Sequence, residues 1–113
     1  MAEGTEFEAR ITFLPPEQGG RRGMICSGYR APFSFGLRGP AGEQEFNDCT
    51  ITLVDRECVS PGEECLARVT PVRPDLVRDV LRIDLPFEVM EGPQRLVGRG
   101  VITRVLAPAG LGR

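Results

Sequence analysis

Apolar and polar residues alternate along several short runs of this chain. Between Glu6 and Leu14, apolar side chains occupy every second position from Phe7 to Phe13, and charged or polar side chains stand between them. A period of two is typical of a strand with one buried face. Further runs with strand character are predicted at residues 24–27, 33–37, 50–54, 65–72, 85–89 and 95–106.

Glycine and proline separate these runs. The chain has 14 Gly and 10 Pro, and short strands separated by such residues are typical of all-β sandwiches and barrels. The Pro61-Gly62 pair predicts a tight turn over Ser60-Pro61-Gly62-Glu63, and Gly28-Tyr29-Arg30 is interpreted as another turn. Six or seven short strands and no strong helix predict a small antiparallel barrel.

One segment departs from the strand pattern. From Asp75 to Arg82, apolar residues recur at helical spacing, and Asp75 is suited to the N-cap position. Two alternatives stay open here, namely two helical turns or an irregular segment that leads into the next strand.

Composition defines a single globular domain. The 113 residues are 41% hydrophobic and 27% charged, and no apolar run approaches the roughly 18 residues that a membrane span needs. The N-terminus is acidic and polar, unlike a signal peptide. We therefore expect a cytoplasmic protein that does not bind membranes.

The chain lacks the residues of most catalytic sites. It has no His, and all 14 basic residues are Arg, so a His base, a Schiff-base lysine and a phosphate-loop lysine are all missing. We expect a protein that is not an enzyme and has no cofactor. The carboxylates Glu63, Glu64, Asp79 and Asp84 are interpreted as surface groups without a catalytic role.

The four cysteines do not predict a metal site. Cys26, Cys49, Cys58 and Cys65 form no Cys-x-x-Cys pair, and no His could complete a zinc site. Buried reduced thiols are the default expectation for a cytoplasmic protein. A Cys49–Cys58 or Cys58–Cys65 disulfide is the less favoured alternative.

Charge is uneven but mild. Residues 1–65 carry eleven acidic residues against six Arg, a balance of −5, and residues 66–113 carry five against eight, a balance of +3. Such values do not predict nucleic-acid binding from bulk charge. The alternative of a small basic patch on one face of the protein is compatible with these values.

Five stretches, in order, resemble domain 3 of bacterial elongation factor Tu, its C-terminal barrel. The stretches are Phe7-Glu8-Ala9 with its strand, Glu17-Gln18-Gly19-Gly20-Arg21, Gly28-Tyr29-Arg30 with Pro32-Phe33-Ser34-Phe35, Val59-Ser60-Pro61-Gly62-Glu63, and Glu91-Gly92 with Arg95 and Val97-Gly98-Arg99-Gly100-Val101. The resemblance covers nearly the whole chain. It implies an all-β fold, a six-stranded antiparallel Greek-key barrel over residues 7–106, with tails at 1–6 and 107–113.

The sequence also departs from that family. The GTPase domain with its phosphate-binding loop and the second barrel are absent, so we expect no GTP binding by this chain. Arg22 stands where the family usually has His, and the segment 74–83 is longer than the family pattern. The resemblance therefore indicates a free-standing, diverged relative of one domain.

The resemblance implies an RNA-contacting surface, because domain 3 of the factor contacts the T-stem of aminoacyl-tRNA. Glycines let a backbone approach phosphate closely, and guanidinium groups bind phosphate bidentately. The candidate RNA- or partner-binding residues are Gly20, Arg21, Arg22, Tyr29, Arg30, Glu91, Gly92 and Arg95. A solvated hairpin with surface arginines is the alternative interpretation.

A second candidate surface is the side that faces the GTPase domain in the factor. Gly98, Arg99 and Gly100 mark this former interdomain face, and Arg99 stands where the family has a small residue. In a lone barrel such a face must become polar or find another partner. Drift of a single residue explains Arg99 equally well.

The sequence thus predicts a binding module. A protein partner linked to translation is the favoured interpretation, and a toxin that exploits the elongation factor is one such partner, with this chain as decoy or immunity protein. Binding of tRNA or other structured RNA is the alternative. Steep salt dependence would favour RNA, because phosphate contacts release counterions.

Overall fold

The computed structural model describes residues 5–106, in which strands are the main secondary structure and the helices are short. In chain order the elements are β1 (Glu6–Phe13), the 3-10 helix η1 (Pro16–Gln18), β2 (Ile25–Cys26), β3 (Tyr29–Ser34), β4 (Asn47–Leu53), β5 (Cys58–Val59), β6 (Glu64–Pro71), α1 (Pro74–Val77), β7 (Pro86–Met90) and β8 (Leu96–Leu106). The strand β1 begins one residue before the predicted start of the barrel at Phe7.

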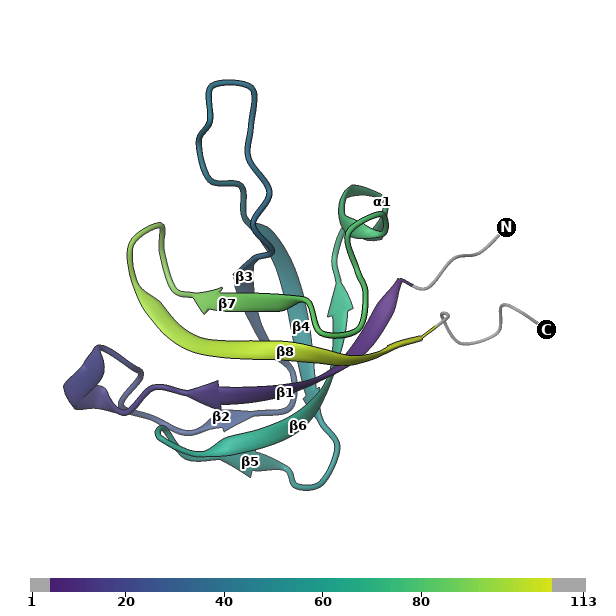
Figure 1. Cartoon of the computed structure of the whole chain (residues 1–113). Helices are drawn as coiled ribbons and strands as arrows, with labels where there is room; N and C mark the ends of the chain where they lie inside the picture. Colours follow the sequence, from purple (N-terminus) through teal and green to yellow (C-terminus); the bar gives the residue numbers. More distant parts are fainter. Residues whose placement is uncertain (1–4, 107–113) are drawn as a thin grey trace.

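Six of the strands close into an antiparallel barrel, which confirms the predicted fold class. Their order around the barrel is β1-β6-β4-β3-β7-β8, and β1 pairs with both β6 and β8. The chain leaves β1, crosses to β3, and returns through β4 and β6 to lie beside β1 again, which is a Greek-key connection. Figure 1 shows β1, β8 and β7 running side by side across the front of the barrel.

The predicted alternation of apolar and polar residues identifies the side chains that form the core. In β1, Phe7, Ala9, Ile11 and Phe13 are all buried, while Arg10 and Thr12 between them are exposed. The strands β4 and β6 alternate in the same way, and the inner faces of all six strands meet in one hydrophobic core. Closure also leaves no unpaired edge strand in the barrel.

Four of the six phenylalanines form the centre of this core. The rings of Phe33 and Phe87 are stacked with centroids 5.1 Å apart, and Phe7 meets Phe87 edge-on at 5.6 Å. Phe35 packs against the same group with its centroid 5.9 Å from that of Phe87. Such offset and edge-on aromatic pairs add stability beyond the area that they bury.

Two predicted turns have different outcomes. The turn at Ser60–Glu63 is confirmed, since the Glu63 amide donates to the Ser60 carbonyl at 3.1 Å and Gly62 has a φ of 92°. The prediction of a turn over Gly28-Tyr29-Arg30 is correct for Gly28 and wrong for the two residues that follow it. Gly28 alone has a left-handed φ, of 98°, and Tyr29 already begins β3, where it pairs with Ile51.

The segment after β6 contains one helical turn, which is less than the two turns of the helical alternative and more than the irregular segment of the other. The helix α1 spans only Pro74–Val77, and a hydrogen-bonded turn continues it to Val80. Arg73, not Asp75, occupies the N-cap position, and Asp75 lies in the first turn, where its carboxylate forms an ion pair with Arg73 at 3.1 Å. Proline at the first helical position supplies the φ that starts the turn.

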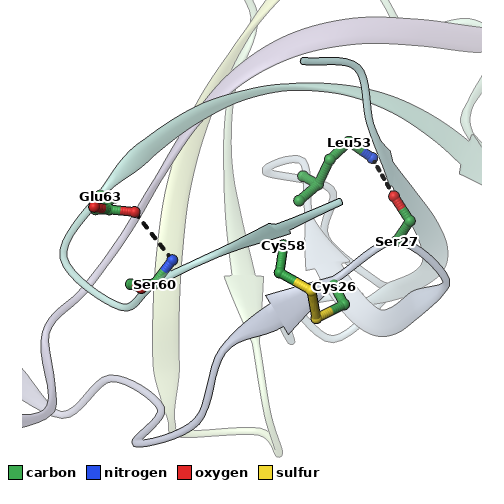
Figure 2. The surroundings of a disulfide bond; sticks show 6 residues. All are labelled: Cys26, Ser27, Leu53, Cys58, Ser60 and Glu63. Atoms are coloured by element: carbon green, nitrogen blue, oxygen red, sulfur yellow. Dashed lines mark hydrogen bonds between the residues drawn. A yellow bond between two sulfur atoms is a disulfide. The ribbon is translucent and has the colours of Figure 1, made fainter. Parts of the chain in front are cut away.

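A disulfide joins Cys26 and Cys58, which corrects the expectation of four reduced thiols and of the other pairings. The two residues lie directly opposite each other in the small β2–β5 sheet, as Figure 2 shows. Beside them, the Leu53 amide donates to the Ser27 hydroxyl oxygen at 2.9 Å. Sequence spacing could not reveal the pairing, because β2 and β5 are strands of two residues each.

The other two cysteines are free and buried, as expected for them. Burial raises the pKa of both thiols, and for Cys65 it raises the pKa to about 11, with the nearby Asp55 carboxylate adding to the effect. Both side chains therefore act as small hydrophobic residues rather than as nucleophiles.

A long hairpin projects from the barrel between β3 and β4 (Figure 1). We call residues 36–46 the β3–β4 arm. Its two sides are joined by the Glu45 amide donating to the Leu37 carbonyl at 3.0 Å and by the Gly39 amide donating to the Glu43 carbonyl at 2.8 Å. Over residues 5–106, no helix has the length and apolarity needed to cross a membrane.

Candidate functional site

Four of the candidate residues meet around one carboxylate. Glu91 Oε2 accepts hydrogen bonds from the Tyr29 hydroxyl at 2.6 Å and from the Arg21 guanidinium, and Glu91 Oε1 lies 3.6 Å from Arg95 Nη1. We call Arg21, Tyr29, Glu91 and Arg95 the Glu91 cluster. Arg21 and Glu91 are 70 positions apart in the sequence, so the cluster joins distant segments of the barrel.

The members come from three separate segments of the chain. Arg21 lies in the loop between β1 and β2, and Tyr29 is the first residue of β3. Glu91 follows β7 and Arg95 precedes β8, and the turn between them is closed by the Glu91 amide donating to the Arg95 carbonyl at 2.8 Å. Gly92, with a φ of 88°, supplies the left-handed residue of that turn.

The Gly19-Gly20 pair shapes the loop that carries Arg21. A side chain at Gly20 would collide with the carbonyl of Leu14, so only glycine fits there. The loop carbonyls then face Arg95, which donates from Nε to the Gly19 oxygen at 3.3 Å and from Nη2 to the Gly20 oxygen at 3.1 Å. Arg95 thereby holds the loop against the β7–β8 turn.

Tyr29 forms the apolar side of the cluster. The Arg21 guanidinium carbon lies 4.9 Å from the centroid of the Tyr29 ring, within cation–π distance, and the ring packs edge-on against Phe13. Burial raises the pKa of the Tyr29 hydroxyl strongly, and its hydrogen bond to the Glu91 carboxylate raises it further. The hydroxyl therefore stays protonated and donates to Glu91.

Glu91 itself is stabilised as the anion. Burial acts to raise its pKa, but hydrogen bonds from Tyr29 and Arg21 and the positive charges of Arg21 and Arg95 outweigh burial, so the pKa of Glu91 is lowered. The side chains of Arg21 and Glu91 are 32% and 25% exposed, so solvent screens this ion pair less than one at the open surface.

Replacing Glu91 with glutamine is expected to lower the free energy of unfolding at neutral pH by about 2 kcal/mol, since it removes a charged acceptor shared by two part-buried donors. Because the folded-state pKa of Glu91 lies below its unfolded value, this contribution is complete above the unfolded pKa and disappears as the pH falls through the folded one. Chemical denaturation of both proteins at pH 7 and at decreasing acidic pH measures it.

Glu45→Gln in the exposed arm serves as the control and should change stability by less than about 0.5 kcal/mol. A constant difference between wild type and Glu91→Gln at every pH would contradict the assigned role of the carboxylate.

The structure thus brings together Gly20, Arg21, Tyr29, Glu91, Gly92 and Arg95 among the candidate binding residues. It does not bring Arg22 or Arg30 into the cluster. Arg22 is exposed in the loop, and Arg30 points to the other face of β3, where it lies 3.4 Å from Asp48. Both arginines of the cluster contact Glu91, and Arg95 also contacts loop carbonyls, so the cluster holds the β1–β2 loop, the start of β3 and the β7–β8 turn together at one end of the barrel.

The second candidate surface divides between the two faces of β8. Gly98 and Gly100 are buried on the inner face, where a side chain at Gly100 would collide with the Phe87 ring and one at Gly98 would press on Phe13. Arg99 between them is exposed on the outer face. The two glycines therefore allow β8 to pass close over aromatic rings of the core, and of these three residues only Arg99 is exposed.

Arg99 lines an open groove of about 1230 Å³ on the outer side of β1, β8 and β7. Its apolar lining includes Phe35, Leu85, Pro86 and Val101, and its charged lining consists of Arg10, Arg38, Glu64, Arg82, Asp84, Glu88 and Arg99. We call this hollow the β7–β8 groove. Residue alternation could have placed Arg10 and Arg99 on the outer face, but the sequence gives no sign that Arg38 and Arg82 lie at the same groove.

No family model matches this sequence. Within residues 5–106, His, Cys, Asp and Glu side chains form no group of three that could hold a metal ion. The barrel thus has two candidate regions, the Glu91 cluster at one end and the β7–β8 groove on its outer face.

Proposed function

We propose that this chain is a non-catalytic binding module that binds a protein partner through the outer face of its barrel. The observation that carries the proposal is the β7–β8 groove. Its volume of about 1230 Å³ exceeds the roughly 300–1,000 Å³ of most small-molecule pockets, which favours a polypeptide as its occupant.

Exposed apolar residues beside the groove support the same conclusion. Val101, which lines the groove, is 42% exposed, and Pro86, which also lines it and pairs with Val101 across β7 and β8, is exposed as well. Apolar side chains that are gathered at an open hollow and surrounded by charged residues are typical of protein-binding surfaces.

The proposed link to translation rests on the resemblance to domain 3 of elongation factor Tu. The motifs that carry this resemblance occur at the positions that shape the barrel: Gly20 allows the loop fold, Gly92 turns β7 into β8, and Gly98 and Gly100 lie over core rings. These positions are consistent with the barrel that the resemblance implies.

The RNA alternative is less favoured by the contacts of its candidate residues. Arg21 and Arg95 already bind Glu91 and loop carbonyls, and phosphate would have to compete with these partners. Arg22 is the exposed arginine of the same loop.

Capture of the tagged chain from its native cells, with bound protein and RNA both identified, tests the proposal. We expect a stoichiometric protein partner that is retained when the salt concentration rises from about 50 to about 200 mM, a change that weakens phosphate-dominated binding by orders of magnitude. Recovery of tRNA that is lost at the higher salt and in Arg22→Ala would establish the alternative. Arg22→Ala is preferred to Arg21→Ala, because Arg21 also holds the loops together.

A further inference from the structure

The charges of the β7–β8 groove differ from those of the rest of the chain. The groove is lined by four arginines and three carboxylates, a balance of +1, whereas the whole chain has a net charge of −2. The residues outside the groove therefore carry −3. The groove is the more positive part of an acidic protein.

Three of its arginines are not engaged with carboxylates. Arg10 forms an ion pair with Glu64 at 3.2 Å. Among residues 5–106, no carboxylate lies within ion-pair distance of Arg38, Arg82 or Arg99. Arg38 and Arg82 make only long contacts, of 3.4 and 3.5 Å, to carbonyls of their own loops.

These arginines come from three separate segments around the apolar lining. Arg38 lies in the β3–β4 arm, Arg82 in the segment before β7, and Arg99 on β8. An occupant whose apolar side chains contact Val101 and Pro86 would therefore meet a guanidinium group from each of the three segments. Guanidinium groups form bidentate hydrogen bonds with carboxylates, which gives such contacts both strength and orientation.

We propose that the β7–β8 groove binds an acidic segment of a partner protein that carries apolar side chains between its Asp or Glu residues. This inference rests on the proposed function and specifies the chemistry of the partner. A nucleic acid fits the groove less well. The net charge of the groove-lining residues is only +1. The rings of Phe35 and Phe87 are buried, at 6% and 3% exposure, so they offer no open face for bases to stack on.

Selection from a library of random displayed peptides, panned against the full chain, tests the inference. We expect the enriched peptides to combine acidic and apolar residues, and we expect Arg82→Glu/Arg99→Glu to weaken their binding about tenfold or more, measured by fluorescence anisotropy. Arg68→Glu/Arg78→Glu is the matched control, because it makes the same change in charge at two arginines outside the groove that, like Arg82 and Arg99, form no ion pair within residues 5–106. Circular dichroism and thermal unfolding verify that both variants fold.

Changing the acidic residues of a selected peptide to lysine should restore binding to Arg82→Glu/Arg99→Glu and abolish it for wild type. Failure to enrich any peptide, a neutral or basic consensus, or equal binding to both double variants would overturn the inference. So would a labelled RNA hairpin that binds tightly and loses binding only in Arg82→Glu/Arg99→Glu.

The same variants distinguish the inference from the proposed function. A captured protein partner that still binds Arg82→Glu/Arg99→Glu overturns the groove assignment and leaves protein binding in place. Absence of any protein partner in native capture overturns the proposed function, whatever the peptides show.

Discussion

Removing the Cys26–Cys58 disulfide is expected to lower the free energy of unfolding by about 3–4 kcal/mol. The bond links residues that are 32 positions apart, and a cross-link that closes a loop of this length restricts the unfolded chain by about that amount. The folded barrel should persist, because its six strands pair without the β2–β5 sheet. Denaturation of Cys26→Ser/Cys58→Ser beside wild type measures the loss.

A reducing agent supplies the control for this experiment. It should bring the stability of wild type down to that of the double variant, and it should leave the double variant unchanged, since the remaining thiols, Cys49 and Cys65, are free and buried. A double variant as stable as oxidised wild type would show that the bond does not contribute to the fold.

Replacing Phe87 with alanine is expected to cost about 3–5 kcal/mol, the range for removing a fully buried aromatic ring. Its ring stacks on Phe33, meets Phe7 edge-on, and covers the inner face of Gly100. The substitution thus opens a cavity beside Gly100, which lies opposite Phe87 in the β7–β8 pairing. Thermal or urea unfolding of the variant measures the effect.

Phe87→Leu tests whether the lost volume is responsible. Leucine keeps much of the volume, so its cost should stay below about 1.5 kcal/mol. Equal losses for Phe87→Ala and Phe87→Leu would indicate that the stacked ring itself, and not the filled space, provides the stabilisation.

The strands that the sequence predicts best are those whose burial alternates. In β1 the pattern from Phe7 to Phe13 specifies both the strand and its buried face, because one side of the barrel wall is core and the other is solvent. The error at Tyr29 has the opposite origin. Gly28 suggested a turn that extends over its neighbours, whereas the left-handed conformation is confined to the glycine, and long-range pairing with β4 makes Tyr29 a strand residue.

The candidate sites depended on contacts that local patterns do not contain. Alternation of apolar and polar residues cannot show that Tyr29 contacts Glu91. The resemblance to a known family, rather than sequence spacing, identified both as candidate binding residues. The Cys26–Cys58 pairing was missed because two-residue strands give no periodic signal. The groove was missed because three of its arginines come from segments that only the folded barrel brings together.

The position of the β3–β4 arm within the chain has a consequence for connectivity. Residues 36–46 lie between Cys26 and Cys58, and the arm is the most prominent projection of the barrel (Figure 1). If a protease cut the arm, the N-terminal fragment would keep the barrel strands β1 and β3, the C-terminal fragment would keep β4, β6, β7 and β8, and each would hold one of the bonded cysteines. The backbone would then be broken but the disulfide would still join the two fragments covalently, so the β3–β4 connection could be opened without releasing either fragment.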